Sequence, residues 1–254
     1  MSMKILVTDP LNKEGIEILK KEKFTVEEKI KLPHDELKKI IKDYDALIVR
    51  SETKVTKDII EASKKLKVIG RAGVGLDNVD ADAASKKGII VMNTPGGNTI
   101  STAEHTMSLL MSLTRNIPQA SASIRKGEWD RKKFMGAELY QKILGIIGLG
   151  RIGTEVAKRA LSFGMKVIAY DPYLSMDKAK QLDIESVDLK GLISCADYIT
   201  VHTPLTDDTK HIISDDEIKA MKKGVRIINC ARGGIIDEKA LVKGIESGKI
   251  AGVA

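Results

Sequence analysis

Three glycines, Gly148, Gly150 and Gly153, follow the apolar run 143–147, and Asp171 ends the next apolar run. Gly148 permits a tight turn after a strand, Gly150 lets a pyrophosphate approach bare backbone, and Gly153 lets the next helix pack against the sheet. The amino end of that helix offers N–H groups to phosphates, and Asp171 is placed to accept the hydroxyl groups of an adenosine ribose. The spacing predicts a dinucleotide site, with an ordinary glycine-rich turn as the alternative. NAD is favoured over NADP because Asp171 would repel a 2′-phosphate.

An arginine between small residues follows a second apolar run, 225–229. In open α/β sheets, ligands bind outside the carboxyl ends of the strands, which places Arg232 at the predicted crevice. Its planar guanidinium can hold a carboxylate through two parallel hydrogen bonds and polarise a neighbouring oxygen. The alternative is a surface arginine paired with Asp237. Cys230 is more typical of a packed small residue than of a nucleophile.

A third group follows the predicted strand 68–69 and contains Arg71 and the glycine-rich stretch Gly73 to Gly75. Successive backbone N–H groups of that stretch can form a concave anion-binding arrangement. Arg50, after another strand, is expected to face the same space. The alternative is a glycine-rich turn with solvated arginines.

The sequence offers no other strong catalytic motif. Of the four histidines, His202 is nearest to the predicted crevice, but we do not expect it to act as an acid or base. No metal-ligand spacing, serine-nucleophile arrangement or P-loop is found.

The composition is ordinary for a globular α/β protein. The net charge of +7 comes from lysines scattered near acidic residues, which indicates a solvated surface and not a nucleic-acid site. No apolar run reaches the length of a bilayer span, and the amino terminus lacks a signal-peptide pattern. Two cysteines do not make a disulfide framework. We therefore expect a cytoplasmic protein that does not act on membranes.

Alternating strands and helices predict an α/β protein with two doubly wound parallel-sheet domains, over residues 1–97 and 98–254. The second is expected to be a Rossmann dinucleotide-binding domain that includes a long helix over 101–114, with Ser101 and Glu104 spaced as a capping box. The predicted strands cover residues 4–8, 25–28, 46–49, 68–69, 89–92, 143–147, 167–170, 198–201, 225–229 and 250–254, with a weak strand near Ile184. The predicted shorter helices of the first domain cover residues 13–21, 34–42, 57–64 and 80–86.

Together these motifs resemble those of the D-isomer-specific 2-hydroxyacid dehydrogenases. The segments that carry the resemblance are 71–80, 93–105, 127–136, 148–153, 201–205 and 229–237, and 129–139 favours the branch that acts on 3-phospho-D-glycerate. The resemblance implies NAD-dependent oxidation of this small anionic 2-hydroxy acid to 3-phosphohydroxypyruvate, in serine biosynthesis. It also implies a homodimer or higher homo-oligomer, paired through the helix after residue 98.

The resemblance assigns roles to individual residues. Arg232 would be catalytic and hold the substrate carboxylate and reacting oxygen. The residues implied for the substrate are Arg50, Arg71, Val74, Gly75 and, from a second subunit, Arg131. The residues implied for the cofactor are Val74, Gly148, Gly150, Arg151, Ile152, Gly153, Asp171, Thr203, Pro204, Cys230, Ala231 and Arg232.

The resemblance also implies parts that this sequence does not contain. In the family, a catalytic Glu and His follow the strand in which the chain ends, so we expect truncation before them, with NAD binding but little turnover. The substrate-binding, flavodoxin-like domain of residues 1–97 would lack its C-terminal return segment. The alternatives are a glyoxylate or hydroxypyruvate reductase, and a non-catalytic NAD-sensing module.

Overall fold

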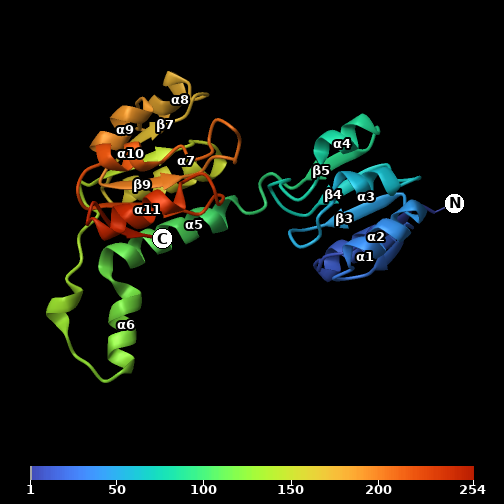
Figure 1. Ribbon diagram of the computed structural model, residues 1–254, viewed down its shortest axis with the longest axis horizontal. Coiled ribbons are helices and arrows are strands. Elements are labelled where there is room, and N and C mark those ends of the chain that lie inside the picture. The colour runs from blue at the N-terminus through green and yellow to red at the C-terminus, as the bar shows by residue number, and fades with distance from the viewer. Residues whose placement is uncertain (1) are drawn as a thin grey trace. The chain divides into compact units, whose positions relative to one another are not determined.

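The structure, a computed structural model, describes residues 2–254 and divides into two compact units. The first unit ends at Asn98 and the second runs from Thr99 to Ala254. Each contains one parallel sheet with helices on its faces, which confirms the predicted fold class (Figure 1).

The first unit contains a five-stranded sheet in the order β2-β1-β3-β4-β5. Its strands are β1 Lys4–Val7, β2 Thr25–Glu28, β3 Ala46–Val49, β4 Val68–Arg71 and β5 Ile90–Asn93. Its helices are α1 Lys13–Lys21, α2 His34–Ile40, the 3-10 helix Ile41–Asp43, α3 Lys57–Ala62 and α4 Ala81–Lys86. The connection after β1 leads to β2 on one side of β1, and the connection after β2 leads to β3 on the other side. The boundary between β1 and β3 is therefore the topological switch point of this sheet.

The two faces of this sheet are covered unequally. Leu6 and Leu47 point to the face that packs against residues of α2, α3 and α4, whereas Ile5 and Val7 pack against α1. On the second face an apolar cavity of about 430 Å³ lies beside Phe24 and extends to β4 and β5. One face of the first unit therefore presents apolar sheet surface that α1 alone does not cover.

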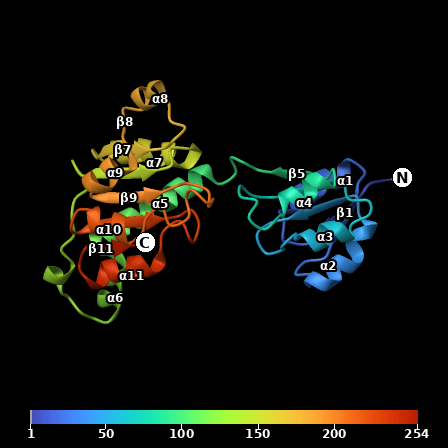
Figure 2. The ribbon, with the colours of Figure 1, turned by 45° about the horizontal axis from the view of Figure 1, so that its top comes forward.

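The second unit contains a six-stranded sheet in the order β11-β10-β9-β6-β7-β8. Its strands are β6 Ile143–Ile147, β7 Lys166–Tyr170, β8 Glu185–Ser186, β9 Tyr198–Val201, β10 Val225–Asn229 and β11 Ile250–Val253. Its helices are α5 Thr99–Arg115, α6 Ile117–Arg125, the 3-10 helix Arg131–Phe134, α7 Arg151–Ser162, α8 Met176–Gln181, α9 Leu189–Cys195, α10 Asp215–Ala220 and α11 Glu238–Glu246. Buried residues of α5 and α7 pack on one face, and those of α9, α10 and α11 on the other (Figure 2).

Both sheets align their central strands with an aspartate at the amino edge. Asp45, directly before β3, accepts a 2.9 Å hydrogen bond from the amide of Lys4, the first residue of β1. Asp197, directly before β9, accepts one of 2.9 Å from Ile143, the first residue of β6. Burial opposes the charged form of Asp197, but this N–H and the ammonium of Lys222 outweigh it and hold the pKa of Asp197 below its usual value.

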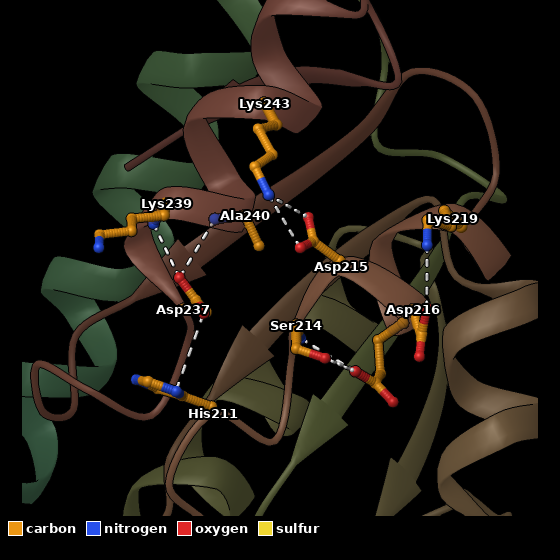
Figure 3. Close-up of polar contacts among 10 residues, drawn as sticks. His211, Ser214, Asp215, Asp216, Lys219, Asp237, Lys239, Ala240 and Lys243 are labelled. Carbon is orange, nitrogen blue, oxygen red and sulfur yellow. Dashed lines mark hydrogen bonds and ion pairs between the residues drawn. The ribbon is translucent and has the colours of Figure 1, made fainter.

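Polar side chains fix the starts of α10 and α11 (Figure 3). Before α10, Ser214 donates its backbone N–H and its hydroxyl to Glu217, at 3.0 and 2.6 Å. Asp237 accepts the amides of the first turn of α11, and the N–H of Ala240 is the main cause of its lowered pKa. Lys243 joins the two helices through Asp215, at 3.0 Å. The loop after β10 therefore ends at a fixed helix start.

The structure corrects several local predictions. Helix α5 begins at Thr99, so Ser101 lies inside the helix and the capping box predicted from Ser101 and Glu104 is wrong. Helix α6 was not predicted, and it follows Asn116 in the left-handed region at φ 53°. In the part of the chain that the structure describes, no helix is long and apolar enough to cross a membrane.

Candidate functional site

The carboxyl ends of β6 and β9 meet at the switch point of the second sheet, and the glycine-rich turn lies there. Gly148 has φ +92°, a conformation that suits glycine. A Cβ on Gly148 would lie 2.7 Å from Thr203 Cγ2 and 2.9 Å from the carbonyl carbon of His202. The turn after β6 therefore runs in close contact with the loop after β9.

The other two glycines have distinct environments. A Cβ on Gly153 would overlap the carbonyl oxygen of Gly148, so helix α7 approaches the turn as closely as backbone allows. A Cβ on Gly150, the N-cap of α7, would meet nothing within 4 Å. Arg151 and Ile152 are the first residues of this twelve-residue helix. Open space beside bare backbone at a helix amino end fits a diphosphate.

Asp171 follows β7, and its carboxylate contacts two backbone segments. Oδ2 accepts a 2.8 Å hydrogen bond from the amide of Leu149, and Oδ1 accepts one of 2.8 Å from Tyr173. Each carboxylate oxygen keeps acceptor capacity for a ribose hydroxyl. Asp171 thus lies directly beside the glycine-rich turn.

Two buried polar atoms beside this turn have no hydrogen-bond partner among the described residues, namely His202 Nδ1 and Thr203 Oγ1. Buried polar atoms are normally paired, so these atoms favour an additional bound group. The other ring nitrogen of His202 lies 3.0 Å from Thr200 Oγ1. Burial lowers the pKa of His202 to about 4, which leaves the imidazole neutral near pH 7.

The loop after β10 is held by Asn229, which sequence reasoning treated only as the end of a strand. Asn229 donates from Nδ2 to the carbonyl of Arg232 at 2.9 Å and accepts the amide of Ala231 at 2.9 Å. Arg232 Nη1 donates to the Ala231 carbonyl at 2.9 Å, and Cys230 packs against the buried cluster beneath the sheet. Arg232, Ala231 and Cys230 therefore stand at the carboxyl edge of the sheet.

In the first unit, Arg50 and Arg71 line one cavity of about 270 Å³, together with Gly73 and Val74. A Cβ on Gly73 would overlap the guanidinium of Arg71, so this glycine makes room for the arginine. Arg71 Nε is buried and has no partner in residues 2–254. Two guanidinium groups around one cavity suit a small anion.

The backbone of this cavity differs in part from the predicted anion-binding arrangement. The amide of Gly73 donates to the Arg71 carbonyl at 2.8 Å and is therefore not free for a ligand. Asn93 donates to the Val74 carbonyl at 2.6 Å, and Thr94 donates to the Gly73 carbonyl at 2.9 Å. The turn that carries Val74 and Gly75 is thus tied to the end of β5.

Two residues that sequence reasoning missed support the loop of Arg50. Asp9, 1% exposed at the end of β1, accepts the amide of Arg50 at 2.6 Å and the hydroxyl of Thr53 at 2.5 Å. Asn78 donates to the carbonyls of Arg50 and Thr53, at 2.7 and 2.6 Å. The available signal was the position of Asp9 after a central strand, at the switch point of the first sheet.

The candidate residues thus form two groups, one in each unit. Arg50, Arg71, Val74 and Gly75 belong to the first unit. The second unit contains the glycine-rich turn, Asp171, the Thr203–Pro204 loop and the loop of Arg232. Arg131 belongs to the second unit and lies in an exposed 3-10 helix after α6.

Comparison with known proteins identifies the second unit. Residues 107–254 match the family model described as D-isomer specific 2-hydroxyacid dehydrogenase, NAD binding domain. This match confirms the resemblance and NAD as the cofactor. The bare backbone at Gly150, the unpaired Thr203 hydroxyl and the carboxylate of Asp171 fit that cofactor.

Individual relatives cover almost the entire chain. D-3-phosphoglycerate dehydrogenase of Methanocaldococcus jannaschii is 56% identical over 253 residues, which are 99% of this chain and 48% of that protein. The enzyme of that name from Homo sapiens is 51% identical over 251 residues, which are 99% of this chain and 47% of that protein. The chain spans about half the length of the curated relatives it matches.

A solved structure has the same fold over both units. The TT0316 protein from Thermus thermophilus is 35% identical, with a TM-score of 0.91, over 99% of this chain and 80% of that chain.

Proposed function

Because this chain belongs to the D-isomer specific 2-hydroxyacid dehydrogenase family, we propose that the whole protein oxidises 3-phospho-D-glycerate to 3-phosphohydroxypyruvate with NAD. We assign it to serine biosynthesis in the cytoplasm. Relatives named for this activity, about half identical over almost the entire chain, support the proposal. The observation that carries the substrate assignment is the cavity with two arginines, because a phosphorylated acid brings more negative charge than an unphosphorylated one.

The cofactor roles follow from the positions of residues in the second unit. Gly150 and the first turn of α7, with Arg151 and Ile152, would hold the diphosphate. Asp171 accepts the ribose hydroxyls and opposes a 2′-phosphate. Thr203, Pro204 and the Cys230–Ala231 segment would hold the nicotinamide half, which would give the Thr203 hydroxyl its missing partner.

Arg232 binds the substrate carboxylate and polarises the reacting oxygen. The substrate loses a hydride from C2 and its hydroxyl proton to a base, which leaves a carbonyl group at C2. NAD, when bound, would supply the acceptor for this hydride. The resemblance to the family gives the role of this base to a His that is supported by a Glu.

The substrate phosphate binds between Arg50 and Arg71, and Val74 and Gly75 present backbone to the carboxylate. Arg131 reaches the phosphate from a second copy of the chain, so the proposal includes a homodimer or higher homo-oligomer. Helix α6 and the segment after it extend away from the sheet of their own unit, which supports a role in pairing (Figure 1).

The test compares 3-phospho-D-glycerate with D-glycerate as substrates of the whole protein, in the native form and as Arg71→Gln. We expect kcat/KM to favour the phosphorylated acid by at least about 100-fold, and Arg71→Gln to remove most of that preference. Equal rates on both acids would overturn the assignment in favour of a reductase for unphosphorylated acids. NAD binding without turnover on either acid would favour a sensing module.

A further inference from the structure

The carboxylate of Asp171 contacts the loop after β6 and the loop after β7. Its Oδ2 accepts the amide of Leu149 and its Oδ1 accepts the amide of Tyr173, both at 2.8 Å. The amide of Gly148 donates to the Tyr170 carbonyl at 2.9 Å, so the same two segments are also joined through backbone. Leu149 itself is 1% exposed.

We propose that Asp171 is a positioning residue that holds the 148–150 turn in its diphosphate-binding shape, in addition to its contact with the ribose. This inference rests on the proposed binding of NAD by this turn. Leu149 stands between two glycines, the residues with the most backbone freedom to lose. Without an acceptor, the amide of Leu149 would lose its partner and the turn would reach other conformations.

Replacement of Asp171 tests the inference, because its two roles predict opposite changes in diphosphate affinity. A carboxylate beside a diphosphate repels it, so removal of the charge alone would strengthen diphosphate binding. Removal of the hydrogen bond to Leu149 would weaken it, because the turn must be ordered on binding. The two effects oppose each other in a ligand that cannot contact the carboxylate through ribose hydroxyls.

The same contacts give the discrimination against NADP a second basis. A carboxylate held by two backbone amides cannot turn away from a 2′-phosphate without losing both hydrogen bonds. Replacement of Asp171 by a small residue therefore removes the repulsion but also loosens the turn. We expect Asp171→Ala to lose NAD affinity without gaining tight binding of NADP.

The experiment measures binding by calorimetry for native protein, Asp171→Ala and Asp171→Asn, with Asp177→Ala as a control. Asp177 lies in the first turn of α8 and, among the described residues, forms no hydrogen bond with the 148–150 turn. The probes are NAD and 2′,3′-dideoxyadenosine diphosphate, which has no ribose hydroxyls. For the dideoxy probe we expect Asp171→Ala to bind about tenfold more weakly, and Asp171→Asn, which keeps an oxygen acceptor for Leu149, to stay within about threefold of native.

Hydrogen exchange at the Leu149 amide in cofactor-free protein gives a second readout, with faster exchange expected in Asp171→Ala and not in the Asp177→Ala control. Circular dichroism establishes that each variant is folded. If Asp171→Ala binds the dideoxy probe as tightly as native protein or more tightly, the inference is wrong even though NAD binds. If native protein binds neither NAD nor the probe, the proposed function fails and the inference fails with it.

Discussion

Gly150 and Gly153 differ in the reason each is glycine. A Cβ on Gly150 would enter open space, whereas one on Gly153 would overlap the carbonyl oxygen of Gly148. We expect Gly150→Ala to fold with native thermal stability and to bind NAD at least about tenfold more weakly, because the methyl group occupies the space of the diphosphate. Calorimetric titration with NAD and a thermal melt measure the two effects.

Gly153→Ala is the matched comparison for that variant. We expect it to lower the free energy of unfolding of the second unit by about 2 kcal/mol, because the helix must move away from the turn. Native stability in Gly153→Ala, or native NAD affinity in Gly150→Ala, would contradict these assignments.

His202 predicts a pH dependence of stability. Its pKa is lowered by burial from 6.5 to about 4 in the folded state, so between these pH values the unfolded chain binds more protons. The free energy of unfolding of the second unit should therefore fall as the pH falls through this window, by at most about 3 kcal/mol from this residue. Urea titrations at several pH values measure the slope.

The variant His202→Asn should lose this part of the slope, whereas His211→Asn should keep it, because the His211 side chain is 47% exposed. An identical slope in native protein and His202→Asn would show that other groups cause the acid sensitivity.

At the scale of elements, the side chain of Lys87 caps the carboxyl end of helix α3, although Lys87 itself follows helix α4. Its ammonium donates to the carbonyls of Ile60, Glu61 and Ser63, at 2.6, 2.9 and 2.5 Å. A helix end leaves its last carbonyls without partners inside the helix, and here Lys87 supplies donors to them. The Ile60 carbonyl also accepts from the amide and the hydroxyl of Ser63. We expect Lys87→Met to lower the free energy of unfolding of the first unit by about 1 kcal/mol, and Lys86→Met to change it little. Denaturant unfolding monitored in the first unit distinguishes the two variants.

The elements that the sequence pattern predicted well are those whose signal is local. Strand β6 and the glycine-rich turn follow from an apolar run and three glycines, and β9 and β10 have the predicted bounds. Helix α6 was missed because its start depends on a left-handed Asn116, which no nearby residue type requires.

Support for the candidate site was the least predictable part. Asp9 reaches residues more than forty positions away in the chain, and the hydrogen bond from Leu149 to Asp171 links the loops that follow the neighbouring strands β6 and β7. Such contacts depend on which strands become neighbours, and hydrophobic periodicity does not carry that information. The roles of Asp9, Asn78 and Asn229 therefore emerge only from the folded chain.

At the scale of the molecule, the α6 segment, residues 117–135, leads us to expect self-association. Trp129 and Met135 are 78% and 80% exposed in that segment, although large apolar side chains usually find cover. If a second copy covers them, Met135→Glu should shift the native oligomer toward monomer while each chain stays folded. Sedimentation velocity at several concentrations measures the shift.

Val242→Glu on α11 is the control for this substitution, because Val242 is also exposed, at 54%, but lies outside the α6 segment. Unchanged association in Met135→Glu, or equal dissociation in both variants, would contradict pairing through this segment.

The aspartates that precede β3 and β9 act on chemistry at the opposite edge of each sheet. Arg50 comes five residues after Asp45, and His202 comes five residues after Asp197. Each aspartate binds the first amide of the neighbouring strand, and this bond fixes the register of the strand that leads to Arg50 or His202. A slip of one residue would displace them by about 3.3 Å and turn each side chain to the other face. We therefore expect ligand selectivity to depend also on Asp45 and Asp197, and a search for altered specificity that samples only the binding loops would overlook them.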